Sequence, residues 1–341
     1  MKKLFGSEIT AEDLQVMNKL LAASANQGDI FAASDAFKKI LAAVVGPIRE
    51  GVLDGDIFGG IYSVQPFAPG TEVKYPLDFV TPGTEGEYAA YTIPKTGYIP
   101  EKNVEGDYVI VPTYKVGLAL DWSIDYARDC RWDIMARVAQ VLEAMLVRKC
   151  NFDGWRNIVA AATDRNVIAL DSNAPAGYFT KRLVSLMQLA MRRYAGGNST
   201  SLNPTTLTDI YISPENMEDI RSWDLTQVDD VTRREIYVNK TGKFSEMFGV
   251  RIHELFELGE NQMLQTYFAA LGGSFTGGDK ELVVGLCKTD AANNAFVMPL
   301  VDSLELYDDP ALLRQQRQGT FGWQRHGFAV LDNRATILGT C

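Results

Sequence analysis

Apolar residues recur at helical spacing through the first 50 residues of the chain. Leu14, Met17 and Leu21 fall on one face of the first such segment. Residues 35–45 repeat the pattern, which ends at a Gly-Pro pair. Neither segment carries enough apolar residues to bury itself. We therefore predict a helical N-terminal arm over residues 1–57, lying against another part of the chain or against a neighbouring copy.

The next segment, residues 58–117, mixes strand-like runs with turn residues. Six of the 13 prolines fall between Pro66 and Pro100, and prolines at such intervals do not fit a central strand. The strand-like runs are "EVKYPLDFV" and "DYVIVPTYKVGLALDW", one on each side of the turn-rich middle. This arrangement predicts a long extended hairpin. A segment of this length without a compact core is usually functional or a binding arm.

The strongest helical signal follows, in "CRWDIMARVAQVLEAMLVRKCNFDGWRNIVAAA". It predicts a helix over residues 132–160, roughly 40–45 Å long at about 1.5 Å per residue. The residues expected on its buried face share 3/4 spacing: Ile134, Val138, Val141, Leu142, Met145, Phe152 and Ile158.

The second half of the chain alternates short strands and helices. A helix over residues 179–194 is expected to end at a pair of glycines. Ile210 and Ile212 alternate with polar residues as a strand would, and Ser213 with Pro214 can then start a helix directly. Short strands and glycine turns continue to residue 300, and the last forty residues predict strand, loop, strand, strand.

Composition limits the possible functions. Hydrophobic residues make up 46% of the chain, which is typical of a globular protein with a sizeable core. No apolar run approaches the roughly 18–20 residues of a membrane span, and the N-terminus does not resemble a signal peptide, so we expect a cytosolic protein. The net charge of −10 argues against a protein that works by gripping phosphates.

The potential metal and phosphate motifs are incomplete. The four cysteines have no zinc-site spacing and are expected to be free thiols. "HELFE" begins like a zinc-protease helix, but Glu257 occupies the place of the second histidine, and we expect His253 to be a surface residue. "GGSFTGGDKE" lacks the Lys and hydroxyl positions of a phosphate loop, so a surface loop is expected. We predict no metal site and no cofactor.

The chain closes with "RHGFAVLDNRATILGTC", which places His326, Asp332 and Cys341 close in sequence. On one continuous strand, His326 and Asp332 would lie about 20 Å apart at about 3.3 Å per residue. Cys341 lacks the rigid surroundings that a nucleophile needs. We therefore predict a closing strand without catalytic residues. Its expected packing residues are Phe328, Val330 and Leu331, with Arg325 and Arg334 available for contacts within or between subunits.

One charge pattern stands out near the end of the chain. Acidic residues gather in residues 302–309, namely Asp302, Glu305, Asp308 and Asp309. Residues 311–331 contain no acid and hold Arg314, Arg317, Arg325 and His326. Two interpretations remain open: a hairpin loop with solvated charges, or acidic and basic sides of the loop that meet between adjacent copies.

This order of elements resembles the major capsid proteins of tailed bacteriophages, which have the HK97-type fold. The resemblance rests on the arm, the Pro-rich hairpin, "YKVGLALDWSIDYARD", the long helix, "YISPENMEDIRSW" and "GFAVLDNRATILGTC" in succession. It implies an α+β fold with these parts: N-terminal arm 1–57, E-loop 58–117, P-domain with its spine helix 118–165 and 295–325, and A-domain 166–294 and 326–341.

The resemblance also implies a function and partners. The chain would assemble with itself into pentamers and hexamers of an icosahedral shell around double-stranded DNA, in the virion capsid, after assembly in the host cytoplasm. Expected partners are a separate scaffolding protein, a portal and a decoration protein, with no membrane and no sequence-specific DNA binding. Residues expected to contact other subunits are Lys74, Lys95, Lys102, Asp308, Asp309, Arg314, Arg317 and Arg325.

Some members of this family weld subunits by a Lys–Asn isopeptide bond with the help of a Glu. Lys74, Lys95 and Lys102 lie in the hairpin, so a donor is present. Residues 311–330, where the partner and helper would be expected, contain no Asn, Asp or Glu. We therefore predict no covalent cross-linking between subunits.

Two other functions remain open. An encapsulin-type nanocompartment shell has the same fold around an enzyme cargo, although its hairpin is usually shorter. A cytosolic enzyme with a site built from scattered Asp, Glu, Tyr and Arg would carry no recognisable motif. Assembly state separates the enzyme from both shells, because a shell subunit forms capsomers or particles.

Overall fold

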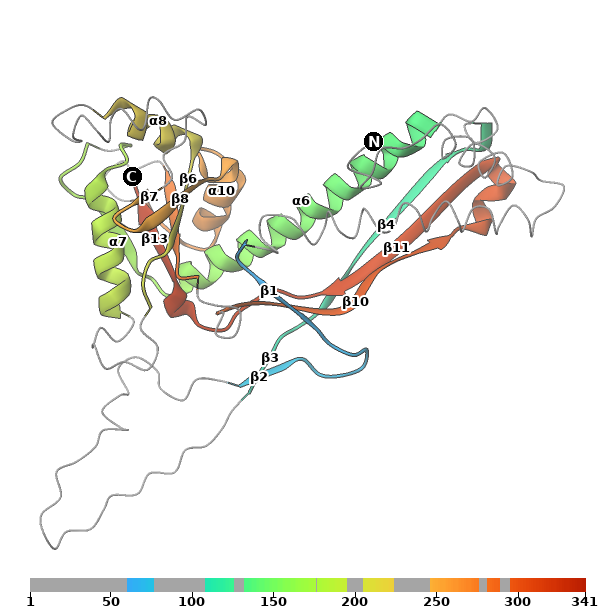
Figure 1. Cartoon of the computed structure of the whole chain (residues 1–341), viewed down its shortest axis with the longest axis horizontal. Coiled ribbons are helices and arrows are strands. Elements are labelled where there is room, and N and C mark those ends of the chain that lie inside the picture. Colours follow the sequence, from blue (N-terminus) through green and yellow to red (C-terminus); the bar gives the residue numbers. More distant parts are fainter. Residues whose placement is uncertain are drawn as a thin grey trace, which may run out of the picture. The chain divides into compact units, whose positions relative to one another are not determined.

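The computed structural model describes residues 60–76, 108–125, 132–175, 177–194, 205–223, 246–275, 281–288 and 295–341 (Figure 1). The predicted N-terminal arm and the middle of the predicted hairpin lie outside these residues. The described residues form two compact units. The first unit takes those within Met1–Lys74, Ile110–Gly154 and Val297–Ala329, and the second takes those within Tyr75–Val109, Trp155–Phe296 and Val330–Cys341.

The first unit is built on a sheet of long strands. Its order is β1 (Ser63–Pro66), β10 (Phe296–Asp308), β11 (Arg317–His326) and β4 (Tyr114–Ser123), with β12 (Ala329–Val330) also paired to β10. β1 runs parallel to β10, whereas β10, β11 and β4 are antiparallel neighbours. A 3₁₀ segment, η4 (Pro310–Gln315), joins β10 to β11, as the predicted strand–loop–strand pattern requires.

The two faces of this sheet differ in exposure. The register of β4 and β11 is unbroken from Tyr114–His326 to Ser123–Arg317. Even-numbered residues of β4 are half-buried from Val116 onward, while the odd-numbered ones from Lys115 to Asp121 are exposed. This alternation is the period-2 pattern of a strand with one covered face.

The hairpin strands are shorter than the sequence suggests. β2 (Lys74–Pro76) pairs with β3 (Tyr108–Ile110) in a separate two-stranded sheet. The predicted strand "DYVIVPTYKVGLALDW" is broken at residues 111–113, where Pro112 separates β3 from β4. The second half of that predicted strand therefore belongs to the sheet of the first unit rather than to the hairpin.

The predicted long helix is confirmed as α6 (Trp132–Asp164), which contributes to the first unit up to Gly154 and to the second from Trp155. The predicted buried face is wrong at Met145, which is 69% exposed, whereas Leu146 and Cys150 are buried. The helix is apolar around much of its surface, so spacing alone could not select the packed side. Of the other predicted face residues, Ile158 is buried and Phe152 half-buried.

The second unit contains a mixed six-stranded sheet. Its order is β5 (Ile168–Leu170), β13 (Thr336–Thr340), β9 (Leu282–Leu286), β6 (Asp209–Ile212), β8 (Val250–Glu254) and β7 (Glu246–Met247). Every residue of β6, β9 and β13 is buried. The strand predicted from Ile210 and Ile212 is therefore confirmed as β6, and all four of its residues are buried.

Helices cover this sheet. α7 (Lys181–Tyr194) confirms the helix predicted at 179–194 and packs on β13 and β5. α8 (Pro214–Ser222) follows β6 directly, as predicted, and the Ser213 hydroxyl accepts a hydrogen bond from the Asn216 N–H. Two further helical segments, η2 (Phe256–Leu258) and α10 (Met263–Ala270), contact each other.

Close packing of α7 requires glycine in the sheet. A Cβ at Gly285 would lie 2.7 Å from Leu207 Cδ1, 2.8 Å from Ile337 Cγ2 and 2.9 Å from Met187 Cε. A Cβ at Gly339 would likewise lie 3.0 Å from the sulfur of Met187. These two glycines allow the side chains of α7 to reach the backbone of the sheet.

The predicted closing strand is wrong as a single element. The segment from His326 onward divides into the end of β11, then β12, the 3₁₀ turn η5 (Asn333–Ala335) and β13. The expected packing residues Val330 and Leu331 are only half-buried, whereas Phe328 is buried as expected. Ile337 and Leu338 of β13 are completely buried between β5 and β9, so β13 is a central strand of the second unit.

Candidate assembly surfaces and polar clusters

The residues predicted to contact other subunits have varied surroundings. Lys95 and Lys102 lie outside the described residues, as does the side chain of Asp308. Lys74 Nζ lies 2.6 Å from Glu72 Oε2 in an exposed ion pair. Arg314 is exposed on η4.

The other three predicted contact residues have partners within the chain. Arg317 pairs with Asp121 of β4, and Arg325 Nε donates to Thr113 Oγ1 over 2.9 Å. The Asp309 carboxylate accepts from the Ala311 N–H over 3.1 Å. Their role in contacts between subunits stays a prediction, because partners within one chain do not exclude partners in another.

The exposed face of the first sheet carries a row of aromatic rings. Tyr307, Phe321 and Trp323 stack in sequence, with ring centroids 5.0 Å apart for Tyr307–Trp323 and 5.9 Å for Tyr307–Phe321. Lys115 Nζ lies 5.6 Å from the Trp323 ring centroid. Tyr307 is 41% exposed, whereas Phe321 and Trp323 are half-buried. Apolar rings beside exposed cations are typical of interaction surfaces.

The opposite face of this sheet packs on α6 through a buried histidine. His326 is completely buried, and its Nε2 lies 3.9 Å from Cys150 Sγ of α6. Its ring lies between those of Tyr114, at 5.1 Å, and Phe328, at 5.3 Å. The pKa of His326 is lowered to about 4, chiefly because the ring is buried. The charge of Lys149 also lowers this pKa, whereas the charge of Asp153 raises it.

Hydrogen bonds to α6 reinforce this contact. The Tyr114 hydroxyl donates to Asp153 Oδ2 over 3.0 Å, and the same carboxylate pairs with Lys149 over 2.7 Å. The Tyr62 hydroxyl donates to the Gly154 carbonyl over 2.9 Å. These bonds fix α6 to the sheet, so the surroundings of His326 are structural in character rather than those of an open catalytic site.

The remaining C-terminal candidates are also bound to structural partners. Asp332 accepts from the Arg334 backbone N–H and pairs with its guanidinium. Cys341 has rigid surroundings, contrary to expectation: it is buried, its thiol donates to Asn216 Oδ1 over 3.2 Å, and its backbone pairs with Glu281. A buried thiol is inert as a nucleophile.

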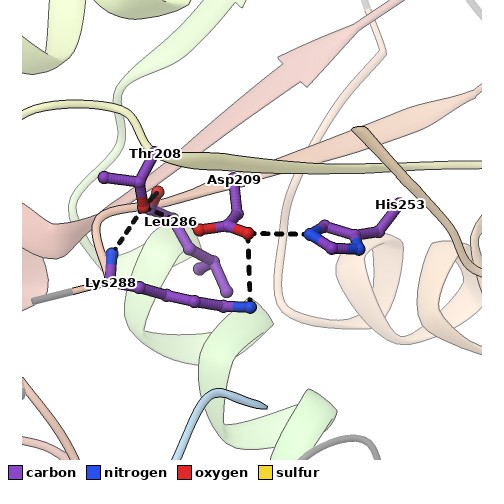
Figure 2. A network of polar contacts seen from close by, with 5 residues as sticks. All are labelled: Thr208, Asp209, His253, Leu286 and Lys288. Carbon is purple, nitrogen blue, oxygen red and sulfur yellow. Dashed lines mark hydrogen bonds and ion pairs between the residues drawn. The ribbon is translucent and has the colours of Figure 1, made fainter. Parts of the chain in front are cut away.

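The most connected polar cluster lies in the second unit, around a buried aspartate (Figure 2). Asp209 Oδ1 lies 2.7 Å from His253 Nε2 and 3.4 Å from Lys288 Nζ. Thr208 Oγ1 lies 2.8 Å from Asp209 Oδ2 and accepts from the Lys288 N–H over 2.8 Å. The carboxylate thus ties β6 to β8 and to the end of β9.

The charge of Asp209 is stabilised by these partners. Burial alone would raise its pKa, but hydrogen bonds from His253 and Thr208 and the charge of Lys288 together lower that pKa below its ordinary value. Tyr211 stacks on the His253 ring at 4.9 Å, and Lys288 lies 5.3 Å from the Tyr211 ring centroid. This cluster holds strands together, and the His253 side chain is 40% exposed, in keeping with its expected surface position.

Sequence reasoning missed this cluster, although one signal was present. Asp209 precedes the apolar run of β6, and a carboxylate at the start of a buried strand needs partners. Glu281 was missed in the same way: it ends the predicted surface loop, yet it is buried and accepts from the Ser213 hydroxyl. The sequence had indicated Ser213, its partner, only as the N-cap of a helix.

The described residues hold no group of three or more His, Cys, Asp or Glu side chains that could bind a metal ion. Cys150, Cys287 and Cys341 are buried thiols, while Cys130 lies outside the described residues. Within the described part of the chain, no helix is long and apolar enough to cross a membrane.

No protein-family model and no curated protein sequence matches the chain. Solved structures do resemble it. A structure of Microbacterium phage Oxtober96 matches with a TM-score of 0.51 and 10% identity, covering 82% of this chain and 88% of that one. The capsid of Myoviridae phage XM1 matches with a TM-score of 0.50 and 12% identity, covering 84% of this chain and 91% of that one. The capsid structure of cyanophage P-SCSP1u matches with a TM-score of 0.50 and 14% identity, covering 83% of this chain and 87% of that one.

These similarities extend over both units and identify the architecture. The chain has the fold of phage capsid proteins, and the α+β, HK97-type fold predicted from the order of its elements is confirmed. At such low identity the similarity shows the fold alone.

Proposed function

We propose that this chain is the major capsid protein of a tailed phage, which self-assembles into the pentamers and hexamers of an icosahedral shell around double-stranded DNA. The observation that carries the proposal is the similarity to two phage capsid structures over 83% and 84% of the chain. A fold shared over this length includes both units rather than one common domain.

The exposed apolar surfaces of the described residues support assembly. Tyr108 and Ile110 of β3 are 62% and 59% exposed, and Tyr307 in the aromatic row of the first sheet is 41% exposed. A chain that functions alone rarely leaves several such surfaces in water. Neighbouring subunits of a shell would cover them.

We further propose that the first unit corresponds to the P-domain and the second to the A-domain. The boundaries predicted from the sequence are residues 118–165 and 295–325 for the P-domain, and residues 166–294 and 326–341 for the A-domain. The two units instead divide at residues 154, 296 and 329. The long helix α6 would then be the spine helix of the P-domain.

The proposed partners follow from the proposed role. A separate scaffolding protein, a portal and a decoration protein would join the shell in the host cytoplasm, and the mature protein would reside in the virion capsid. The net charge of −10 would limit adhesion of DNA to the shell, which suits a container that binds no particular sequence.

Size-exclusion chromatography and electron microscopy of the purified chain test this proposal. We expect capsomers or closed shells, well above the 37.7 kDa of one chain. A stable monomer at micromolar concentration would contradict a shell protein and favour an enzyme. Shells from infected cells should contain nuclease-protected DNA. Shells that instead enclose an enzyme and no DNA would indicate a nanocompartment.

Covalent bonding between subunits has its own test. Residues 311–330 offer no Asn, Asp or Glu as partner or helper for a lysine of the hairpin. Mature particles boiled in detergent should therefore run as a single band of chain mass on a denaturing gel. A ladder of multimers would show that cross-links form elsewhere.

A further inference from the structure

The second unit presents an exposed basic surface on α7. The helix contains four basic residues and no acidic one, and Lys181, Arg182, Arg192 and Arg193 are all exposed. Arg182 lies 3.7 Å from Asp171, which compensates one of these charges. Lys181 and Arg182 occupy the first turn, where the helix dipole disfavours cations. Their position is thus unfavourable for the helix itself.

Apolar side chains lie within this basic surface. Leu189 is 47% exposed near the middle of α7. The turn between β7 and β8 adds Phe248, which is 58% exposed and has a φ of 53°, a conformation that bulky residues rarely adopt. Gln188 Nε2 donates to the Phe248 carbonyl over 3.1 Å, which fixes this turn against α7. We call Leu189, Phe248 and the four cations the basic surface.

An acidic surface lies around η2. Glu257 and Glu260 are exposed beside Phe256, which is 69% exposed. The exposed Glu215 of α8 belongs to the same surface, because its Oε2 lies 2.9 Å from the Cβ position of Gly259. We call these four residues the acidic surface.

The acidic surface also affects the carboxyl group beneath it. Burial raises the pKa of Glu281, a hydrogen bond from Ser213 opposes the rise, and the charges of Glu215, Asp219 and Glu260 add to it. The negative charges of these carboxylates therefore repel that of Glu281. A cationic partner would relieve this repulsion.

The two surfaces lie on opposite sides of the sheet. Gly285 faces α7, and Ile210 is its register partner. The adjacent Tyr211 must therefore point to the other face, where it contacts Trp155 of α6. The next residue of α6, Arg156, lies over Tyr267 of α10, and α10 contacts η2. Figure 1 shows α7 and α10 on opposite flanks of the strands.

We propose that the basic surface of one copy docks on the acidic surface of the next, in a head-to-tail contact between second units. Charge complementarity and an exposed aromatic ring on each side favour a second copy of this chain as the partner. Because the contact joins two different surfaces, it repeats from copy to copy and forms a ring when the rotation between copies closes, as the proposed capsomers require. The inference rests on the proposed shell function and names the surfaces that would form each capsomer.

Charge reversal on each surface tests the contact. The basic variant is Arg192→Glu with Arg193→Glu, and the acidic variant is Glu257→Lys with Glu260→Lys. Each should lower the assembled fraction roughly tenfold or more at about 0.15 M salt, because like charges then meet. Combining all four substitutions should restore assembly to within about threefold of the wild type, since the attraction is re-formed with the signs exchanged.

Controls separate the possible outcomes. Asp164→Lys reverses an exposed charge outside both surfaces, at the C-terminal end of α6 where a cation is favourable, and should assemble normally. Circular dichroism and thermal melting verify that each variant is folded. Normal assembly of either folded double variant overturns the inference, as does a folded fourfold variant that fails to recover. If only the basic variant loses assembly, α7 binds a different anionic partner. A wild-type chain that never assembles would instead reject the proposed function.

Discussion

The sheet of the second unit is covered on both faces, whereas the sheet of the first unit has one face in water. Strands β6, β9 and β13 are buried along their whole length. In β4 of the first unit, exposed residues alternate with half-buried ones, and an aromatic row lies on the exposed side. The second unit thus buries its central strands on both faces, while the first leaves one face of β4 exposed.

Substitution of Gly285 by Val should produce the largest effect. Its side chain would overlap Leu207, Ile337 and Met187, all within 3.0 Å of the new Cβ. We expect a loss of about 3 kcal/mol or more in the free energy of unfolding, measured by urea denaturation.

The matched control is Gly117→Ala on the open face of the first sheet. Its nearest neighbour to the new Cβ would be the Gly322 carbonyl oxygen, at an ordinary 3.5 Å. The change in unfolding free energy should stay within about 0.5 kcal/mol. Equal losses at both glycines would contradict the difference between the two sheets.

Acid should destabilise the first unit through His326, on its covered face. Burial lowers the pKa of His326 to about 4 from an ordinary 6.5, so between these pH values only the unfolded chain binds the proton. The stabilisation is complete above pH 6.5 and is lost as the pH falls towards 4, by about 3 kcal/mol in total. Thermal melts of the wild type and His326→Leu across this range would measure the difference.

The two proteins should differ in the slope of stability against pH, with the variant flatter. His253→Gln serves as the control, because His253 is partly exposed and lies in the second unit. The His253→Gln variant should keep the dependence of stability on pH that His326 causes between pH 4 and 6.5. If His326→Leu retained the full acid sensitivity, another group would be responsible.

The Asp209 cluster tests how far the second unit depends on polar contacts. Asp209→Asn removes the charge that binds His253 and Lys288, and should cost about 2 kcal/mol at pH 7 by chemical denaturation. The pKa of Asp209 is lower in the folded state than in the unfolded state. The Asp209 carboxylate therefore stabilises the fold fully at a pH above its unfolded-state pKa, and this stabilisation is lost as the pH falls through its folded-state pKa.

The difference between wild type and Asp209→Asn should accordingly shrink in strong acid. Asp164→Asn, at an exposed position of the same unit, should cost nothing measurable. A difference that persists unchanged at low pH would point to packing rather than charge as its source.

The smallest effect is expected on the open face of the first sheet. Arg317→Gln breaks the ion pair between Arg317 and Asp121. The Arg317 side chain is 49% exposed and that of Asp121 is 36% exposed. Exposed pairs contribute little, so the unfolding free energy should change by less than about 1 kcal/mol. Assembly measured on the same variant shows whether Arg317 matters for contacts between subunits. A loss of several kcal/mol would show that this face is less open than its exposure indicates.

Local signals in the sequence were sufficient for several elements. The long helix, α7, and the strand that leads into Ser213 and Pro214 were predicted because each depends on residues close in sequence. The order of these elements was enough to predict the capsid fold. The packed side of α6 was not predictable, because Met145 and Leu146 are equally apolar and only the neighbouring sheet distinguishes them.

The sequence by itself therefore determined the elements and their order, since helix periodicity, caps and turns are properties of short segments. Tertiary structure alone decided that β13 is central, that His326 and Cys341 are buried, and that Asp209 joins His253 to Lys288. These residues are far apart along the chain, and their environment arises only when distant strands pair. The same holds for the opposed charges of the second unit, because a linear sequence does not specify which helices lie on which side of a sheet.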